Sequence, residues 1–166
     1  KGVFGCKKTA VRTSAKTFVR LTLDDAGEEP FELLKVLEST GSTSELTGAK
    51  IVLSGGIGLG SRENFEKLFT LARLTGAAVG ASRAAVAAGY ASYMHQVGQT
   101  GVSVNPELYI AFGISGAVQH LSGIMGANRI AAVNTDPKAP IHSYCDCSVI
   151  ADCVEVLDSL ILHYIN

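Results

Sequence analysis

The chain has 166 residues, a length that fits one domain with a core of ordinary size. With 14 lysines and arginines against 15 acidic residues, its formal charge of -1 excludes a polybasic nucleic-acid binder or membrane-surface protein. Hydrophobic residues make up 47% and charged residues 17%, which excludes disorder for the bulk of the chain. No apolar run reaches the roughly 18–20 residues of a spanning helix, so we expect no direct membrane insertion.

The first 50 residues differ from the rest because they hold 15 of the 29 charged side chains. Within them, residues 11–23 alternate in the manner of an edge strand, and residues 41–44 read as a polar linker. We therefore expect a domain boundary near residues 45–50, with residues 1–45 before it and one domain over residues 46–166.

From residue 51 on, short apolar runs alternate with helical patterns. Strands are predicted at residues 51–54, 77–81, 108–112 and 130–133, and near Tyr144. Helices are predicted after the capping residues Ser61 and Ser82, up to about Leu121, and over residues 152–165. This order predicts an α/β fold, a three-layer Rossmann-like parallel sheet with helices on both faces.

Residues suited to bind a ligand follow the first four of these strands, and ligands of parallel sheets bind at the carboxyl ends of strands. They are residues 55–60, 82–83, 113–116 and 134–136. Residues 67–135 hold four Lys/Arg and only one acid, Glu107, so a cleft there would attract an anion such as a pyrophosphate. Arg83 opens a predicted helix, where the helix dipole disfavours a cation, so a ligand is expected for it.

Spacing alone leaves other functions open. The glycines at 55–60 miss the G-x-G-x-x-G pattern, because position 61 is serine, but a domain in which Arg83 binds an NADP phosphate is an alternative. Residues 113–116 resemble a nucleophile elbow, but position 117 is alanine, and His120 is poorly placed to pair with Ser115. No catalytic residue is therefore assigned. Residues 96–101 suit either the edge of a flat heteroaromatic ring or a surface turn.

Four cysteines are present: Cys6, Cys145, Cys147 and Cys153. Their spacing fits no zinc template well, although His142 and His163 lie nearby in the sequence. The spacing favours reduced thiols in a reducing compartment, and no metal site is assigned.

Several motifs, taken in order, closely resemble the FAD-binding domain of the electron transfer flavoprotein alpha subunit. They are LTGAK at 46–50, SGG at 54–56, GASRAAV at 80–86, QVGQTG at 96–101, PELYIA at 106–111, GISGAVQH at 113–120 and DPKAPI at 136–141. The resemblance covers about residues 46–166. Residues 1–45 look like the end of that family's N-terminal domain and a linker, with most of that domain missing.

The resemblance implies a redox carrier rather than an enzyme with substrate chemistry of its own. In this family an alpha/beta heterodimer binds FAD, accepts electrons from acyl-CoA and other flavoprotein dehydrogenases, and passes them to a membrane ubiquinone oxidoreductase, as in fatty acid β-oxidation. The implied compartment is the mitochondrial matrix in a eukaryote and the cytoplasm in a bacterium.

The resemblance also implies roles for individual residues. Arg83 would place a positive charge beside the flavin ring, Thr100 would hydrogen-bond its N5 edge, and His120 would face its pyrimidine edge at O2. The other implied contacts are Val97, Gly98 and Gln99 beside the ring, Ser82 near the diphosphate, Ser115, Gly116, Ala117, Val118 and Gln119 around the ribityl and phosphate groups, and Asn134 and Asp152 at the adenosine end.

Two positions depart from the family pattern. Ile57 stands where the family usually has an arginine close to the cofactor, and Gly60 stands where it usually has lysine or a polar residue. One cationic contact to FAD is therefore expected to be missing. A module that has lost its cofactor is an alternative, but Arg83, Thr100 and His120 favour retention of FAD.

Overall fold

The computed structural model describes residues 42–165 of the chain. The chain divides into two units, Lys1–Leu37 and Glu38–Asn166, and the described residues all lie in the second. The strand expected at residues 11–23, most of the expected preceding domain, and Cys6 lie outside the described residues. The linker expected at 41–44 is wrong over residues 42–44, which begin helix α1 (Ser42–Gly48). Serine and threonine suit the first turn of a helix as well as a linker, and Leu46 anchors this helix in the core.

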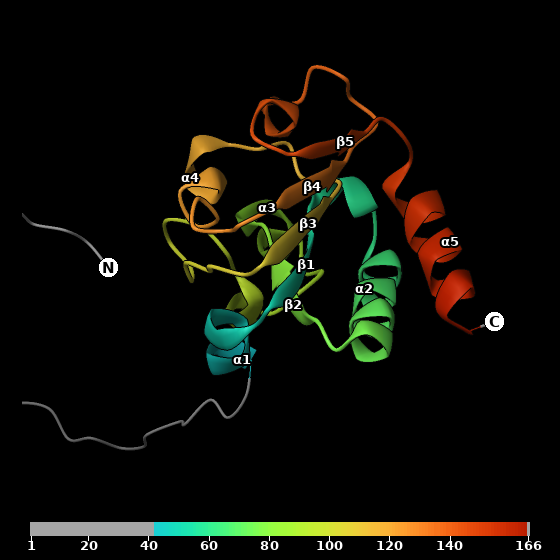
Figure 1. The fold of residues 1–166 in the computed structure, drawn as a ribbon, viewed down its shortest axis with the longest axis horizontal. Helices are drawn as coiled ribbons and strands as arrows, with labels where there is room; N and C mark the ends of the chain where they lie inside the picture. The colour runs from blue at the N-terminus through green and yellow to red at the C-terminus, as the bar shows by residue number, and fades with distance from the viewer. Residues whose placement is uncertain (1–41, 166) are drawn as a thin grey trace, which may run out of the picture. The chain divides into compact units, whose positions relative to one another are not determined.

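A single sheet of five parallel strands organises the described residues (Figure 1). The strands are β1 (Ile51–Gly55), β2 (Ala78–Ala81), β3 (Leu108–Phe112), β4 (Ile130–Val133) and β5 (Cys147–Val149). Their spatial order is β2-β1-β3-β4-β5, and every neighbouring pair is parallel. The predicted Rossmann-like α/β fold is confirmed.

Helices cover both faces of the sheet, as predicted. Figure 1 shows α2 (Arg62–Thr75) and α5 (Cys153–Ile165) side by side on one face, and α1 and α4 (Val118–Leu121) on the other. Strand alternation divides the core accordingly, since successive side chains point to opposite faces. Leu53 and Phe112 pack with the α2 and α5 side, whereas Val52 and Tyr109 pack with the α1 and α4 side.

The predicted helix caps are present. The Ser61 hydroxyl accepts a hydrogen bond from the Asn64 amide at 3.2 Å, and α2 ends at Gly76, which adopts φ 69°. The Ser82 hydroxyl likewise accepts from the Ala85 amide at 3.2 Å and begins α3 (Arg83–Ala87). Both caps satisfy amide groups that the first helical turn leaves unpaired. The described residues also include three short 3-10 helices: η1 (Ile57–Leu59), η2 (Tyr93–His95) and η3 (Pro140–Ser143).

The last strand lies a few residues beyond its predicted place. Tyr144 follows η3, and the strand runs from Cys147 to Val149. All three residues of β5, which lies at one edge of the sheet, are exposed. An exposed, three-residue strand carries neither a buried apolar run nor a clear alternation, so the pattern gave no signal there.

The strand order reverses between β1 and β3, which makes the space beyond their carboxyl ends the expected ligand site of such a sheet. The two loops that leave these strands touch. The Gly56 amide donates to the Phe112 carbonyl at 2.8 Å, and the Gly58 amide donates to the Gly113 carbonyl at 3.0 Å. A Cβ at Gly56 would overlap the Gly113 carbonyl oxygen, so this close approach requires glycine. Within residues 42–165 no helix is long and apolar enough to cross a membrane.

Candidate functional site

A cavity of about 400 Å³ opens where the strand order reverses. The segments that follow β1, β2 and β3 all contribute to its wall, through Ile57, Arg83 and Ser115 respectively. Most of the cofactor contacts expected from the sequence line it, namely Ser82, Arg83, Val97, Gly98, Gln99, Thr100, Ser115, Ala117, Gln119 and His120. Residues from separate parts of the chain thus meet at one cavity of the size that small-molecule sites have.

Four expected contact residues lie outside the wall of this cavity. Gly116 is buried against the backbone of Ile141, and Val118 is 74% exposed at the start of α4. Asn134 donates from Nδ2 to the Ile114 carbonyl at 3.0 Å. Asp152 accepts from the Val154 and Glu155 amides at 2.7 and 3.2 Å and so caps α5. For these residues a contact with the cofactor stays a prediction.

Arg83 contributes a positive charge to the cavity wall. It occupies the first position of α3 and is exposed. Among residues 42–165 no carboxylate forms a salt bridge with it, and its guanidinium has no hydrogen-bond partner. A cation at the start of a helix without a counter-ion is poorly stabilised by the protein itself. The position is therefore suited to an anionic or electron-rich ligand.

The loop after η2 is held tightly in place. The Val97 amide donates to the Ala81 carbonyl at 2.9 Å, and the Gln99 amide donates to the Gln119 carbonyl at 2.7 Å. These bonds connect the loop to the end of β2 and to the segment that includes α4. Gly98 has φ 137°, and a Cβ there would lie 2.7 Å from the Gln119 carbonyl oxygen, so a side chain would push the loop away.

His120 lies at the inner end of the cavity and is only 6% exposed. Its Nε2 is hydrogen-bonded to the Tyr109 hydroxyl at 2.9 Å, whereas its buried Nδ1 has no partner within hydrogen-bond geometry. Burial lowers the pKa of His120 to about 4, and the nearby Val97 backbone acts in the opposite direction. The ring is therefore neutral at physiological pH, and its buried Nδ1 has no hydrogen-bond partner among the described residues.

Two residues lie behind the cavity wall, and neither was predicted there: Gln96 was only part of the candidate loop 96–101, and Tyr109 was part of a predicted strand. Gln96 is 4% exposed and donates from Nε2 to the Thr100 hydroxyl at 3.0 Å, and Tyr109 is fully buried. Tyr109 stands in an apolar strand pattern and therefore looked like a core residue. The sequence predicted only that it lies in a strand over residues 108–112, and the structure places it on the sheet face that α4 covers. Apolar wall residues such as Ile114 and Ala87 gave none.

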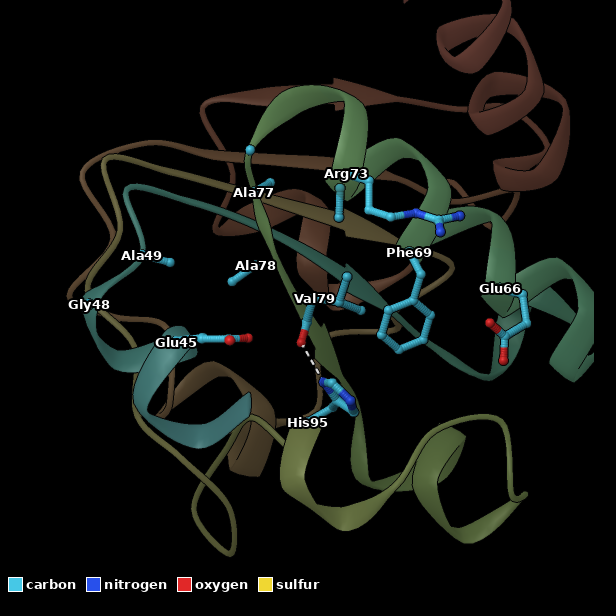
Figure 2. A pocket seen from close by; sticks show the side chains of 12 residues that line it. Glu45, Gly48, Ala49, Glu66, Phe69, Arg73, Ala77, Ala78, Val79 and His95 are labelled. Atoms are coloured by element: carbon cyan, nitrogen blue, oxygen red, sulfur yellow. Dashed lines mark hydrogen bonds between the residues drawn. The ribbon is translucent and has the colours of Figure 1, made fainter. Parts of the chain in front are cut away.

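A larger cavity of about 810 Å³ lies elsewhere, beside the amino end of β2. Figure 2 shows Phe69 of α2 and His95 of η2 together on its wall; their rings meet edge to face at 5.2 Å, and His95 Nδ1 is bonded to the Val79 carbonyl at 3.0 Å. None of the expected cofactor contacts lines it. Because ligands of parallel sheets bind at carboxyl ends, we take the smaller cavity as the candidate site.

The described cysteines do not form a metal centre. Cys145, Cys147 and Cys153 are free thiols. Among residues 42–165, no group of three or more His, Cys, Asp or Glu side chains is arranged to hold a metal ion. His142 instead bonds the Ser148 hydroxyl at 2.6 Å and the Asp136 carbonyl at 3.1 Å.

The parallel sheet, the cavity at its switch point and Arg83, which is unpaired within the described residues, are typical of nucleotide-binding α/β domains. Comparison with known proteins is more specific. The family model described as "Electron transfer flavoprotein FAD-binding domain" matches residues 45–125. The chain belongs to the electron transfer flavoprotein alpha family and carries its FAD-binding domain.

Similar proteins occur in plants and bacteria. The mitochondrial electron transfer flavoprotein subunit alpha of Oryza sativa subsp. indica is 54% identical over 117 residues, which are 70% of this chain and 33% of that protein. The subunit alpha of Pseudomonas aeruginosa is 48% identical over 136 residues, 82% of this chain and 43% of that protein. Protein FixB of Clostridium saccharobutylicum is 44% identical over 146 residues, 88% of this chain and 43% of that protein. The chain thus spans less than half the length of these relatives.

FAD is the cofactor of this domain family, and the cavity fits it on two observations. The buried Nδ1 of His120 lacks a partner, and Arg83 lacks a counter-ion within the described residues. A bound flavin offers polar atoms at the edge of its ring to His120 and electron-rich groups to Arg83. Leaving the buried Nδ1 unpaired would be unfavourable in a domain without a ligand, whereas the exposed Arg83 is then hydrated.

Proposed function

We propose that this chain forms the FAD-binding part of an alpha/beta heterodimeric electron carrier. The carrier accepts electrons from acyl-CoA and other flavoprotein dehydrogenases and passes them to a membrane ubiquinone oxidoreductase, as in fatty acid β-oxidation. It has no substrate chemistry of its own. The observation that carries the proposal is the meeting of Arg83, Thr100 and His120 at one cavity beside the switch point of the sheet.

FAD supplies the redox chemistry when bound, and the residues of this chain set its surroundings. Arg83, which has no counter-ion among the described residues, supplies a positive charge beside the flavin ring. Such a charge favours any form of the ring that carries negative charge, and the effect is largest where water is excluded. Arg83 is exposed in the chain alone, so the beta subunit would have to cover this side of the cavity.

Thr100 is prepared to donate a hydrogen bond. Its hydroxyl oxygen accepts from the Gln96 amide at 3.0 Å, so the hydroxyl proton is left to point elsewhere. We place this proton at the N5 edge of the flavin. Ser82 is assigned to the diphosphate, Ser115 to Gln119 to the ribityl and phosphate groups, Val97 to Gln99 to the side of the ring, and Asn134 and Asp152 to the adenosine end.

The partner and the compartment follow from the same proposal. A beta subunit would complete the cofactor site and the docking surface for dehydrogenases. The relatives include a protein named as mitochondrial and bacterial proteins. We therefore place the carrier in the mitochondrial matrix if the source is a eukaryote and in the cytoplasm if it is a bacterium.

A relay assay tests this function. The full-length alpha subunit, purified with its beta partner, is mixed with an acyl-CoA dehydrogenase and its substrate under anaerobic conditions. We expect the flavin absorption of the carrier to bleach and to recover when a membrane quinone oxidoreductase and quinone are added. A carrier that holds FAD but does not bleach with any flavoprotein dehydrogenase would contradict the proposed donors, and bleaching without recovery would contradict the proposed acceptor.

A further inference from the structure

A group of hydrogen-bonded polar residues joins η3 to the edge strand β5. It consists of the His142 ring on η3, the Ser148 hydroxyl on β5 and the backbone carbonyl of Asp136. None of these residues lines the cavity that we take as the candidate cofactor site. His142 is half-buried, whereas Ser148 is exposed. The ring is thus held in place by its surroundings, and the hydroxyl can be reached from solvent.

The partners of the two ring nitrogens decide where the protons of this group lie. Nε2 of His142 is 3.1 Å from the Asp136 carbonyl oxygen. A carbonyl oxygen can only accept a hydrogen bond, so Nε2 carries a proton. In the neutral ring Nδ1 is then bare, and it lies 2.6 Å from the Ser148 hydroxyl oxygen. Ser148 is therefore the donor, and its proton points at a base.

A neighbouring thiol does not compete for this base. Cys145 donates from Sγ to the His142 carbonyl at 3.5 Å, which is a backbone atom and not part of the ring. Among residues 42–165, the hydrogen bonds of the His142 ring go to Ser148 and Asp136. The imidazole is thus paired with the serine and not with the thiol.

A hydroxyl bonded to an imidazole that a third group orients is the arrangement of an activated serine nucleophile. Here a backbone carbonyl takes the place of the orienting carboxylate, and the two ring nitrogens exchange their usual roles. Within residues 42–165 no strand pairs with the outer edge of β5, as Figure 1 shows. Backbone amides along such an edge are left without a strand partner. Amides beside a nucleophile can stabilise the oxyanion that forms during acyl transfer.

We propose that Ser148 is a self-acylation site that takes an acyl group from an activated carboxylic ester, with His142 as its general base. Ser148 Oγ forms a bond to the carbonyl carbon of the ester while Nδ1 of His142 takes the hydroxyl proton. The bond from that carbon to the leaving oxygen then breaks, and the leaving alcohol receives the proton from Nδ1. The products are an acyl ester of Ser148 and a free alcohol, with no change in oxidation state. The inference goes beyond the proposed electron carrier and does not depend on it.

A comparison of two serines in the unmodified protein tests the proposal. The full-length alpha subunit with its beta partner is incubated with 4-nitrophenyl acetate, and peptide mass spectrometry follows acetylation at each serine. Ser122 is the matched reference, because it is exposed but donates to the Gln119 carbonyl at 3.0 Å and not to a base. We expect Ser148 to be acetylated about a hundredfold faster, the lower range of general-base catalysis. Equal rates would overturn the proposal and leave the bond between Ser148 and His142 a structural link only.

A pair of histidine variants tests the role of the base. His142→Gln removes the imidazole and keeps a polar side chain, whereas His163→Gln removes an exposed imidazole of α5. We expect His142→Gln to lower the rate at Ser148 close to that of Ser122, and His163→Gln to leave it unchanged. Melting temperatures show whether both variants are folded. An unchanged rate at Ser148 in a folded His142→Gln protein would overturn the proposal, and the comparison with Ser122 stands without any variant.

A second route to the same product passes through a thiol. Cys145 or the exposed Cys147 could take the acetyl group first and pass it to Ser148. A double variant, Cys145→Ala with Cys147→Ala, removes this route and leaves His142 and Ser148 in place. We expect the rate at Ser148 to stay the same. Loss of acetylation at Ser148 in the folded double variant would show that a thiol is the nucleophile and would overturn the proposal.

Discussion

The side-chain amide of Gln96 donates a hydrogen bond to the hydroxyl of Thr100, with 3.0 Å between Nε2 and Oγ1. Gln96 is 4% exposed, whereas Thr100 is exposed at the mouth of the cavity. A buried donor thus directs the hydroxyl of an exposed residue that would otherwise rotate freely. The direction of the Thr100 proton, and hence its use toward the cofactor, depends on a residue that stands behind the cavity wall.

Replacing Gln96 by methionine should therefore act through Thr100. We expect the FAD dissociation constant to rise about three- to tenfold and the free energy of unfolding to fall by about 1 kcal/mol, the usual net value of one hydrogen bond. Flavin fluorescence and denaturant titration measure the two effects. In a Thr100→Val background the same Gln96→Met change should cost little FAD affinity, and full additivity of the two losses would show that they act separately.

Arg83 should matter for binding and not for folding. Because it is exposed at the start of α3 and unpaired within the described residues, Arg83→Gln should leave the melting temperature of the cofactor-free protein unchanged or slightly higher. The loss of a charged hydrogen-bond donor should weaken FAD binding about tenfold or more. Arg83→Lys, which keeps the charge, should retain part of the affinity. Equal affinity of Arg83→Gln and the parent would contradict the assigned role.

Ile57, one of the two positions at which this chain departs from the family pattern, gives a prediction of opposite sign for FAD affinity. Ile57 lines the cavity and is 49% exposed, so an arginine has room to extend from it. Ile57→Arg should strengthen FAD binding about threefold or more at low salt, with the gain shrinking as ionic strength rises. Ile57→Leu serves as the uncharged control. An affinity for FAD that does not change with Ile57→Arg at any salt concentration would show that this departure has no effect on the cofactor.

The buried imidazole of His120 should make stability depend on pH. Burial lowers its pKa to about 4 from an ordinary value of 6.5. Below pH 6.5 the unfolded chain therefore binds a proton that the folded domain does not, so folding stability is fully present above about pH 6.5 and is lost as the pH falls through about 4. The loss amounts to at most about 3 kcal/mol. His120→Gln should flatten this part of the stability profile, while substitution of the exposed His163 should not.

The contact between the two glycine loops should be intolerant of any side chain. At Gly56 a Cβ would overlap the Gly113 carbonyl oxygen, and the nearest atoms all belong to the backbone of residues 113–114, so no flexible side chain can move away. We expect Gly56→Ala to lower the free energy of unfolding by about 3 kcal/mol or more. Gly48→Ala is the matched control, because no heavy atom lies within 4 Å of a Cβ there. Comparable losses for the two variants would refute the contact.

The sequence allowed a good prediction of the central sheet and of one side of the cavity. Short buried strands such as residues 51–55 carry a strong apolar signal, and Ser61 and Ser82 mark helix starts by their capping chemistry. Because parallel strands bring their carboxyl ends together, Arg83 and Ser115 could be expected at one site before their positions were known. The motifs shared with the family added Thr100 and His120.

The features that the sequence did not predict depend on tertiary contacts between residues that are distant in the chain. Tyr109 looks like a strand residue of the core, and only the pairing of its hydroxyl with His120 shows a polar function. Gln96 likewise lies in a loop whose sequence fits a surface turn, yet its side chain is buried. Strand β5 is exposed along its length and gave no periodic signal, and residues 42–44 suit a linker and a helix start equally well.

The central claim is that this chain binds FAD between the ends of its strands. The most direct measurement is the visible absorption spectrum, with quantification of released flavin, of the full-length alpha subunit purified gently with its beta partner. We predict a yellow protein with about one FAD per heterodimer, lowered by Arg83→Gln. A folded, colourless heterodimer that takes up no added FAD would contradict the account.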